Sequence, residues 1–447
     1  MEVTKSMSRS KTTMKLHPKL AKLKNSAEKR SKITDVFVEP SFKMNHINTG
    51  STVLNMLIGG SRLKDGSFIC PGWPKGKIVE IFGRESSGKT TIALHAMAQG
   101  ILNGGKEDGC GLYIDLETAI VDTYAMKLGV DFRPPELGGS GQSIRAQPHS
   151  FEETESLVMT AALNSVDVVV IDSVAALVSE RENKRNVTDP KQKHGVAEVP
   201  RLMAQWLPKL QRVIADTGTL VIFLNQTRDK IGAMGFSEEA LKSTTGGNAL
   251  KFFSAIRMML KPKRSTKAKV WNPILKERED VQIATDVECK MIKNKIDAKQ
   301  GHSGLVTIRY GVGVDELRTM LNVAEAYDIV KKKKNNRKQD VFSFCGENGS
   351  VEAIGIERFR LGLQKENDGA MMKELIMLCQ ESIIQGYRAI DDETLARLAE
   401  DAVTTHEGMD DDEYPDSGGP PNYENGRLVG DEGLEEAVPV IAPDIQV

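Results

Sequence analysis

The chain has 447 residues, 40% of them hydrophobic and 27% charged, which is enough apolar material for one large domain and a smaller one. The formal net charge is only -2, but residues 1–32 are strongly basic and residues 401–447 are strongly acidic. Such a split is typical of chains that handle nucleic acid, and it is equally compatible with two solvated ends.

The five cysteines form no C-x-x-C pair, which favours reduced thiols over disulfides or a zinc site. No apolar run approaches the ~18 residues that a membrane span requires. The basic N-terminus also lacks the apolar segment of a signal peptide. We therefore expect a soluble protein of the cytoplasm that makes no contact with a membrane.

From residue 47 onward, short apolar runs rich in β-branched residues alternate with helix-like segments such as 90–102 and 201–216. The apolar runs are continuous rather than alternating, as in strands that are buried on both faces. The expected strands lie within residues 76–83, 111–117, 166–173, 218–226 and 255–261. This order predicts an α/β fold with a mostly parallel, twisted sheet flanked by helices.

Composition also suggests how the chain is divided. We expect a basic N-terminal arm or helix at residues 1–45 and the α/β core at residues 46–316. A small α+β domain with a polar hairpin should occupy residues 317–400, and an acidic disordered tail should occupy residues 401–447.

The segment "GRESSGKT" at residues 83–90 matches G-x-x-x-x-G-K-[ST] between an expected strand and an expected helix, as in a P-loop. Glycines let backbone N–H groups turn toward anionic oxygens at the positive end of the helix. Lys89 can neutralise phosphate charge, and the Thr90 hydroxyl can bind Mg²⁺. The candidate nucleotide-binding residues here are Gly83, Arg84, Glu85, Ser86, Ser87, Gly88, Lys89, Thr90 and Thr91.

Two acidic positions complete the predicted site. Asp172 ends the strand "VVVID", where open α/β sheets place their ligands, and it is a candidate for holding the metal. Glu117 ends the strand "LYIDLE" and is suited to orient an attacking water. Asp115 is its rival, since it lies two residues earlier on the same face.

Several blocks occur together in a characteristic order: "GRESSGKTT", "YIDLETAIVDTYAMKLGVD", "VDVVVIDSVAAL", "LNQTRDKIGAMG" and "TTGGNALKFFSAIRMML". Over about residues 47–315 the chain resembles the RecA family of homologous-recombination ATPases, of the bacterial type or a phage-encoded relative. The resemblance is far more specific than a P-loop, and it excludes kinases and small GTPases.

The resemblance implies ATP and Mg²⁺ as cofactors and assigns roles at the nucleotide. Glu117 matches the catalytic glutamate, and this match decides the choice against Asp115. The catalytic residues implied by the resemblance are Glu117, Lys89 and Gln226. Gln226 matches a glutamine that senses the γ-phosphate, and Tyr124 matches an aromatic that stacks on adenine. Lys293 and Lys295 match lysines that reach the ATP of a neighbouring subunit, so ATP would join subunits into a helical filament.

The resemblance also implies two DNA-binding loops for single-stranded DNA and a homologous duplex. The first lies within residues 179–199 and is followed by Arg201, which otherwise suits a surface ion pair. The second follows Gln226 and mixes cations with apolar side chains, a combination that suits single strands. Its candidate residues are Arg228, Lys230, Ile231, Gly232, Met234, Phe236, Thr245, Gly246, Gly247 and Asn248. The resemblance further implies that the protein acts in recombination, DNA repair and the SOS response to DNA damage. Single-strand-binding protein and loading factors would be further partners.

Some positions depart from the family pattern. Arg84 stands where the bacterial type usually has proline, Val121 replaces a frequent acidic residue, and residues 61–76 look like an insertion. Pro208 is expected to interrupt the helix after the first DNA loop. The lysine run at residues 331–334 could attract duplex DNA or form a solvated linker.

Two alternative functions stay open from sequence. A ring-forming helicase or motor can be built on the same core, although the "TTGGNALKFF" block argues against it. A low-turnover ATP-dependent scaffold is the second, although Lys89, Glu117, Asp172 and Gln226 together argue against that one.

Overall fold

The computed structural model describes residues 43–63, 65–102, 108–184, 198–229, 242–244, 247–297, 299–365 and 369–385, together with two short strands near the C-terminus. Contacts divide the chain into two units, Met1–Ala389 and Ile390–Val447. In the second unit, the described residues form β16 (Tyr423–Glu424) paired antiparallel with β17 (Arg427–Leu428). The predicted N-terminal arm and acidic tail otherwise lie outside the described residues, except for residues 43–45.

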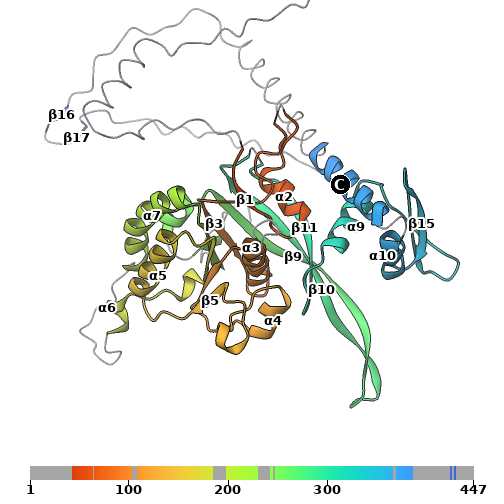
Figure 1. Ribbon diagram of the computed structural model, residues 1–447, viewed down its shortest axis with the longest axis horizontal. Helices are drawn as coiled ribbons and strands as arrows, with labels where there is room; N and C mark the ends of the chain where they lie inside the picture. The colour runs from red at the N-terminus through yellow and green to blue at the C-terminus, as the bar shows by residue number, and fades with distance from the viewer. Residues whose placement is uncertain are drawn as a thin grey trace, which may run out of the picture. The chain divides into compact units, whose positions relative to one another are not determined.

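A large mixed sheet forms the centre of the first unit (Figure 1). Its strands are β3 (Ile78–Gly83), β4 (Gly111–Asp115), β5 (Ser143–Ala146), β6 (Val168–Asp172), β7 (Leu220–Asp229), β8 (Lys242–Thr244), β9 (Ile256–Asn272), β10 (Glu277–Asn294), β11 (Ser303–Arg309) and β12 (Gly313–Val314). Their order is β12-β11-β10-β9-β3-β7-β6-β4-β5, with β8 pairing β7. The six strands from β9 to β5 are parallel to their neighbours, which confirms the predicted mostly parallel α/β fold.

Helices cover both faces of this sheet. They are α2 (Thr52–Gly59), α3 (Lys89–Leu102), α4 (Asp122–Lys127), α5 (Phe151–Leu163), α6 (Glu180–Asn183), α7 (Glu198–Thr217), α8 (Gly247–Phe253) and α9 (Glu316–Ala326). Successive side chains of β6 point to opposite faces of the sheet and so belong to two separate hydrophobic clusters. Val168 and Val170 pack with α2 and α3. Val169 and Ile171 pack with α5 and α7. Strands buried on both faces explain the continuous apolar runs in the sequence. No described helix is long and apolar enough to cross a membrane.

The predicted interruption at Pro208 is wrong, because α7 continues through it from Glu198 to Thr217. The apolar face of α7 buries Met203, Trp206, Leu207, Leu210 and Ile214. Pro208 lies on the exposed face, where water can satisfy the carbonyl group that loses its helical hydrogen bond. Burial of the opposite face therefore outweighs the local cost of the proline.

A second, three-stranded sheet follows α9 in the chain, in the order β13 (Lys331–Lys334), β14 (Asp340–Gly346) and β15 (Gly349–Ile354). Strands β14 and β15 form the predicted polar hairpin, and α10 (Ile356–Lys365) packs on it. The lysine run is not a linker: it is the exposed edge strand β13, paired with β14.

Residues 61–76, which the sequence analysis interprets as an insertion, contact parts of the chain that are distant in sequence. Its strand β2 (Trp73–Pro74) pairs with β1 (His46–Ile47), and Trp73 is fully buried. Arg62 lies over the Phe68 ring and forms an ion pair with Glu381. Ser61 donates a hydrogen bond to Asp297 at 2.8 Å.

His95 couples α3, which begins at the P-loop, to strand β12. Its Nε2 accepts a hydrogen bond from the Val314 amide at 2.9 Å. Burial lowers the pKa of His95 below its ordinary value of 6.5, because the charged ring would lose its hydration. The unfolded chain therefore takes up this proton at a higher pH than the folded chain does. Stability that is present above pH 6.5 is lost as the pH falls through the lowered pKa.

We expect His95→Gln, which keeps an acceptor but does not titrate, to weaken this pH dependence. Between about pH 7.5 and about pH 5.5, its thermal unfolding midpoint should fall less than that of the unmodified protein. His149→Gln, at an exposed position, is the control and should keep the original dependence. An equal fall in the midpoints of His95→Gln and the unmodified protein would contradict the assignment.

Candidate active site

The P-loop turns from β3 into α3 with a backbone that requires glycine at two positions. Gly88 has a φ of +91°, and a Cβ on it would lie 2.3 Å from Cδ1 of Ile308. A Cβ on Gly83 would lie 2.6 Å from the carbonyl oxygen of Leu260. The turn therefore brings the N-terminal end of α3 to the carboxyl end of the parallel strands, where N–H groups can bind phosphate.

Lys89 points back over this loop. Its Nζ donates hydrogen bonds to the carbonyl oxygens of Arg84 at 2.8 Å and Gly83 at 3.3 Å. Burial lowers the pKa of Lys89, and the nearby carboxylates of Asp172 and Glu117 partly offset this effect. The ammonium group thus lies inside the curve of the loop, where phosphate oxygens would be neutralised.

Thr90 and Asp172 meet as predicted for a metal site. Thr90 Oγ1 donates to Asp172 Oδ2 at 2.9 Å, and the Tyr113 hydroxyl donates to the same oxygen at 2.7 Å. Burial raises the pKa of Asp172, while these two hydrogen bonds act in the opposite direction. Hydroxyl and carboxylate oxygens are ligands that Mg²⁺ accepts, and it usually takes only one or two carboxylates from the protein. The donor set therefore fits Mg²⁺.

Glu117 lies next to Gln226 at the same edge of the sheet. Gln226 Nε2 donates to Glu117 Oε1 at 2.9 Å, and Ser173 Oγ donates to the same oxygen. Asp115 is buried instead, at 2% exposure, and its carboxylate accepts a hydrogen bond from the Ala119 amide. Glu117 is exposed at the site, so geometry separates the two carboxylates that spacing alone left open.

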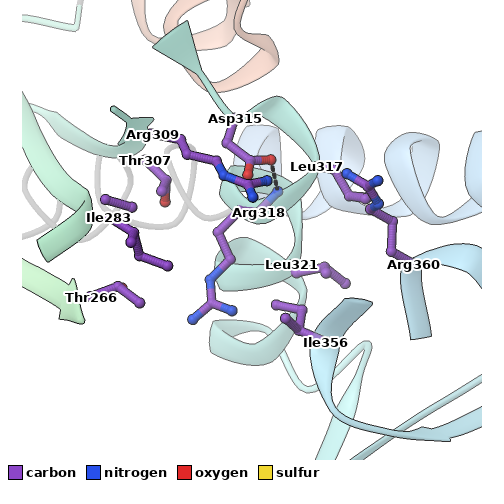
Figure 2. A pocket seen from close by; sticks show the side chains of 11 residues that line it. Thr266, Ile283, Thr307, Arg309, Asp315, Leu317, Arg318, Leu321, Ile356 and Arg360 are labelled. Atoms are coloured by element: carbon purple, nitrogen blue, oxygen red, sulfur yellow. Dashed lines mark hydrogen bonds between the residues drawn. The ribbon is translucent and has the colours of Figure 1, made fainter. Parts of the chain in front are cut away.

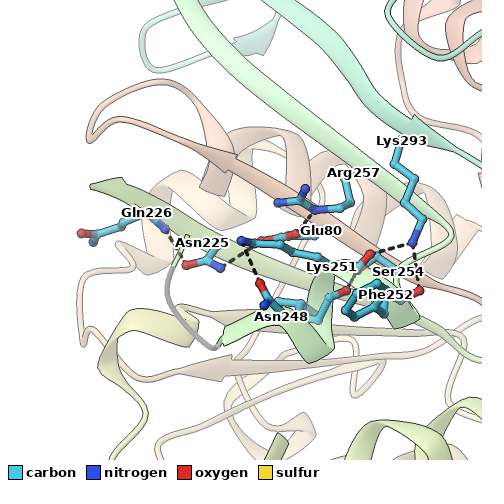
Figure 3. Close-up of polar contacts among 10 residues, drawn as sticks. Glu80, Asn225, Gln226, Asn248, Lys251, Phe252, Ser254, Arg257 and Lys293 are labelled. Carbon is cyan, nitrogen blue, oxygen red and sulfur yellow. Dashed lines mark hydrogen bonds and ion pairs between the residues drawn. The ribbon is translucent and has the colours of Figure 1, made fainter. Parts of the chain in front are cut away.

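A buried polar network supports Gln226 from behind (Figure 3). The side-chain oxygen Oδ1 of Asn225 accepts a hydrogen bond from the backbone N–H of Gln226, and Asn225 Nδ2 donates to Glu80 Oε1, both at 2.9 Å. Glu80 and Asn225 are fully buried, and Arg257 pairs with the other oxygen of Glu80. The guanidinium of Arg257 also lies over the Phe82 ring. Because a buried charge needs such partners, this network fixes the backbone at Gln226.

A cavity of about 440 Å³ adjoins the P-loop. Tyr124 lines it, and its hydroxyl hydrogen-bonds Thr91 Oγ1 at 2.9 Å. The sequence prediction missed the opposite wall, which comes from β10, β11 and the following turn. Those residues are Thr285, Val287, Ile308, Tyr310 and Gly311. Ile308, Tyr310 and Gly311 belong to the segment "IRYGVG", which begins more than two hundred residues after the P-loop and is placed there by strand pairing.

Not every predicted nucleotide-binding residue lines this cavity. Ser86, Ser87, Gly88, Lys89, Thr90 and Thr91 do. Arg84 and Glu85 are exposed and line a separate hollow together with Gly83 and Thr227.

Lys293 and Lys295 also lie away from the cavity in their own chain. Lys293 Nζ donates to the carbonyl oxygens of Lys251 at 2.6 Å and Phe252 at 2.9 Å, near the end of α8 (Figure 3). Burial and the neighbouring charge of Lys295 lower the pKa of Lys293. Lys295 lines a different hollow with Lys77 and Phe253.

The predicted DNA-binding residues are only partly described. Arg201 is exposed on α7, Arg228 lies in β7, and Gly247 and Asn248 begin α8. Gly247 has a φ of +74°, and its Cβ position lies 3.0 Å from Pro200. Pro200, which follows the first predicted loop, and Gly247, at the end of the second, therefore lie side by side. Outside the described residues lie Lys230, Ile231, Gly232, Met234, Phe236, Thr245 and Gly246, as well as positions 185–197 of the first loop.

The fold and the site together define a P-loop nucleotide-binding protein with a doubly wound α/β core. Residues 14–315 match the family model described as the RecA N-terminal domain. The chain belongs to the RecA family, as its sequence blocks predicted.

Bacterial relatives named "Protein RecA" align over most of their own length. The Chlorobaculum parvum protein is 37% identical over 329 residues, which cover 73% of this chain and 78% of the relative. The Bacillus licheniformis protein is 32% identical over 366 residues, covering 80% of this chain and 90% of the relative. The Mesoplasma florum protein is 36% identical over 279 residues, covering 62% and 75%.

If Tyr124 stacks on the base, its ring should carry most of its contribution to nucleotide binding. We expect Tyr124→Ala to weaken Mg²⁺–ATP binding by roughly 5- to 150-fold, the range for loss of one base–aromatic stack. Tyr124→Phe, which loses only the hydroxyl bonded to Thr91, should stay within about threefold. Titration calorimetry measures both, with exposed Leu163→Ala as the unchanged control. Unaltered affinity in Tyr124→Ala would exclude Tyr124 from the base contact.

Proposed function

We propose that this chain is an ATP-dependent DNA recombinase that polymerises on single-stranded DNA and exchanges strands with a homologous duplex. Family membership supports ATP-dependent recombination and repair, and it does not favour the ring motor or the scaffold. The observation that carries the proposal is the 2.9 Å contact between Gln226 and Glu117. It joins the candidate water-activating carboxylate to the strand that leads into the predicted second DNA loop.

ATP is the nucleotide and Mg²⁺ the metal in this proposal. Thr90 and Asp172 would hold Mg²⁺, which would supply positive charge to neutralise the phosphates. Lys89 balances further charge on the phosphates from within the loop. Tyr124 holds the base against the wall formed by β10 and β11.

In hydrolysis, Glu117 orients the water that attacks the γ-phosphate. Gln226 lies within hydrogen-bond distance of Glu117, so its amide can bond either to that carboxylate or to a γ-phosphate oxygen. Cleavage removes the phosphate partner and changes how Gln226 is held. Strand β7 continues from Gln226 through Arg228 to Asp229, and so passes this change toward the DNA loop.

Filament assembly uses the surface that carries Lys293 and Lys295. Neither lysine lines the cavity of its own chain, which supports a contact with the ATP of a neighbouring subunit. A head-to-tail contact that does not close on itself yields a helix, and this is the assembly that we propose. In this proposal residues 46–316 form the ATPase core and residues 317–400 a small C-terminal domain. The N-terminal arm contacts the next subunit, and the cytoplasm is the site of action.

DNA binds where the two predicted loops leave the core, beside Arg201 and Gly247. The acidic tail, residues 401–447, shields this surface from duplex DNA. Single-strand-binding protein and loading factors are the further partners that we infer. Pairing between DNA strands supplies the sequence specificity, and no DNA bond is made or broken by the protein.

Glu117→Gln tests the hydrolytic role. We expect ATP turnover in the presence of single-stranded DNA to fall by roughly 10²- to 10⁴-fold, the usual contribution of a general base. ATP binding should persist, because Glu117 contacts the water rather than the phosphates. Steady-state phosphate release and ATP titration measure the two effects. Glu136→Gln, at an exposed position away from the cavity, should keep full turnover. Turnover retained in Glu117→Gln would remove Glu117 from this role.

Electron microscopy of the same mixtures separates the alternatives. Helical filaments with DNA-stimulated hydrolysis are the expected result. Closed rings would indicate a motor, and filaments without turnover in the unmodified protein would indicate a scaffold.

A further inference from the structure

The hairpin of β9 and β10 is much longer than the sheet needs. Strand β9 pairs with β3 only at residues 256–260, and β10 pairs with β11 only at residues 284–290. The outer residues, 267–282, pair only with each other among the described strands and extend as a two-stranded ribbon (Figure 1). We call residues 267–282 the outer ribbon. Sequence inspection identified only the first few residues of β9 as a strand.

The end of the outer ribbon is apolar and exposed. Ile274 is 88% exposed, Leu275 60% and Trp271 56%. An isolated two-stranded ribbon is only marginally stable in water. Large apolar side chains exposed together at its end are not stabilised by contact with water, and such patches mark interaction sites. Such a tip is expected where a partner covers it.

The two faces of the ribbon differ in charge. Because side chains alternate along a strand and cross-strand partners share a face, Lys267, Lys269 and Trp271 lie on one face. Arg278 is opposite Trp271 and joins them, with Asp280 as the acidic residue of that face. Lys267, Lys269 and Arg278 are exposed and have no ion-pair partner within 4.0 Å among the described residues. We call this side the cationic face.

The other face is apolar and acidic. It carries Val270 and Val281 together with Glu277 and Glu279, and Glu279 accepts a hydrogen bond from Asn272. Closer to the sheet the basic residues are already engaged, since Lys263 pairs with Glu288. Among the paired strand residues of the outer ribbon, the unpaired cations are thus confined to one face, and Lys276 adds a further positive charge in the turn.

Positive charge continues at the foot of the ribbon. Thr266 and Ile283 line a cavity of about 110 Å³ together with Arg309 and Arg318 (Figure 2). Arg309 and Arg318 form no ion pair within 4.0 Å in the described part of the chain. Asp315 also lines the cavity, and its carboxylate accepts the Arg318 amide hydrogen at the start of α9. These two guanidinium groups lie beside Thr266, whose side chain points to the face opposite Lys267, so they add positive charge at the foot of the ribbon and do not extend the cationic face.

We propose that the outer ribbon is an arm that binds duplex DNA. The cationic face contacts phosphates and releases their counterions. A two-stranded ribbon fits the major groove of B-DNA, where exposed apolar side chains at its tip can contact base edges such as the thymine methyl group. Lys267, Lys269 and Arg278 contact the backbone while Ile274 and Leu275 contact the bases. This arm deepens the proposed function, because it gives the recombinase a contact for the incoming duplex apart from the loops that hold the single strand.

Charge favours duplex DNA over a second copy of the chain as the occupant. The cations stand beside the one aromatic side chain of the ribbon, which is the combination that recognises nucleic acid. A neighbouring subunit would have to supply a matching acidic surface, and it becomes the alternative outcome in the test.

The experiment uses the full chain and a fluorescent 30-base-pair duplex, with anisotropy measured at several salt concentrations. The triple variant Lys267→Gln/Lys269→Gln/Arg278→Gln removes the cationic face. Its plot of log affinity against log salt should be less steep by about 2 to 3, since each phosphate contact contributes about 0.9. The matched control Lys127→Gln/Lys209→Gln/Arg212→Gln removes the same charge from exposed positions elsewhere and should keep the slope.

A second variant tests the tip. Ile274→Ser/Leu275→Ser should lower duplex affinity about tenfold without changing the slope, because it removes base contacts and leaves the cations. Equal slopes in the ribbon triple and the unmodified protein would overturn the proposal, as would an equal loss in the control. Shorter filaments with unchanged duplex affinity in the tip variant would assign the ribbon to a second copy instead.

Binding to a labelled single strand with ATP is measured in parallel. If the unmodified protein binds no single strand, the recombinase proposal fails, while the duplex slopes still decide whether the ribbon is a DNA arm. If single-strand binding and its ATPase stay normal in all variants, a loss of duplex affinity belongs to the ribbon alone.

Discussion

The parallel register of β3, β4, β6 and β7 is the constraint on which the site depends. Gly83 lies level with Gln226 across one pair of strands, and Asp115 lies level with Asp172 across another. All four strands therefore end at one edge, and the first residues beyond them face a common space. The P-loop, the bonded pair Thr90–Asp172 and Glu117 are brought together by this alignment. A shift of register by one residue would turn the Asp172 side chain to the opposite face.

The buried network behind Gln226 extends this constraint into the antiparallel half of the sheet. Glu80 on β3 bonds to Asn225 on β7 and pairs with Arg257 on β9. On β10, the partner of β9, Lys293 donates hydrogen bonds to two carbonyl groups near the C-terminus of α8, which begins just after the predicted second DNA loop. A cation at a helix C-terminus stabilises it. The residues proposed to meet ATP in one subunit and its neighbour thus share a rigid sheet with the elements that frame the DNA loops.

Local rules were sufficient where a feature depended on neighbours in sequence. The spacing of "GRESSGKT" predicted the P-loop, and the change to a short polar pattern predicted the hairpin of β14 and β15. The same rules failed at Pro208, because the energy of burying the far face of α7 does not appear in the residues beside the proline. They also failed for the outer ribbon, because its mixed charged sequence has no hydrophobic period that identifies a strand. Its strands are recognised only from the pairing of β9 with β10.

The sequence by itself determined the family, the α/β class and the residue types available for binding phosphate and metal, since motif chemistry resides in short, contiguous segments. The resemblance to the family chose Glu117 over Asp115, and only the tertiary structure showed the physical difference between these carboxylates, because Asp115 is buried and bonded to Ala119 whereas Glu117 bonds to Gln226. The tertiary structure also decided that Tyr310 and Thr285 complete the cavity and that three cations of the ribbon share a face. Those facts depend on pairing between strands distant in the chain, and no local pattern encodes that pairing.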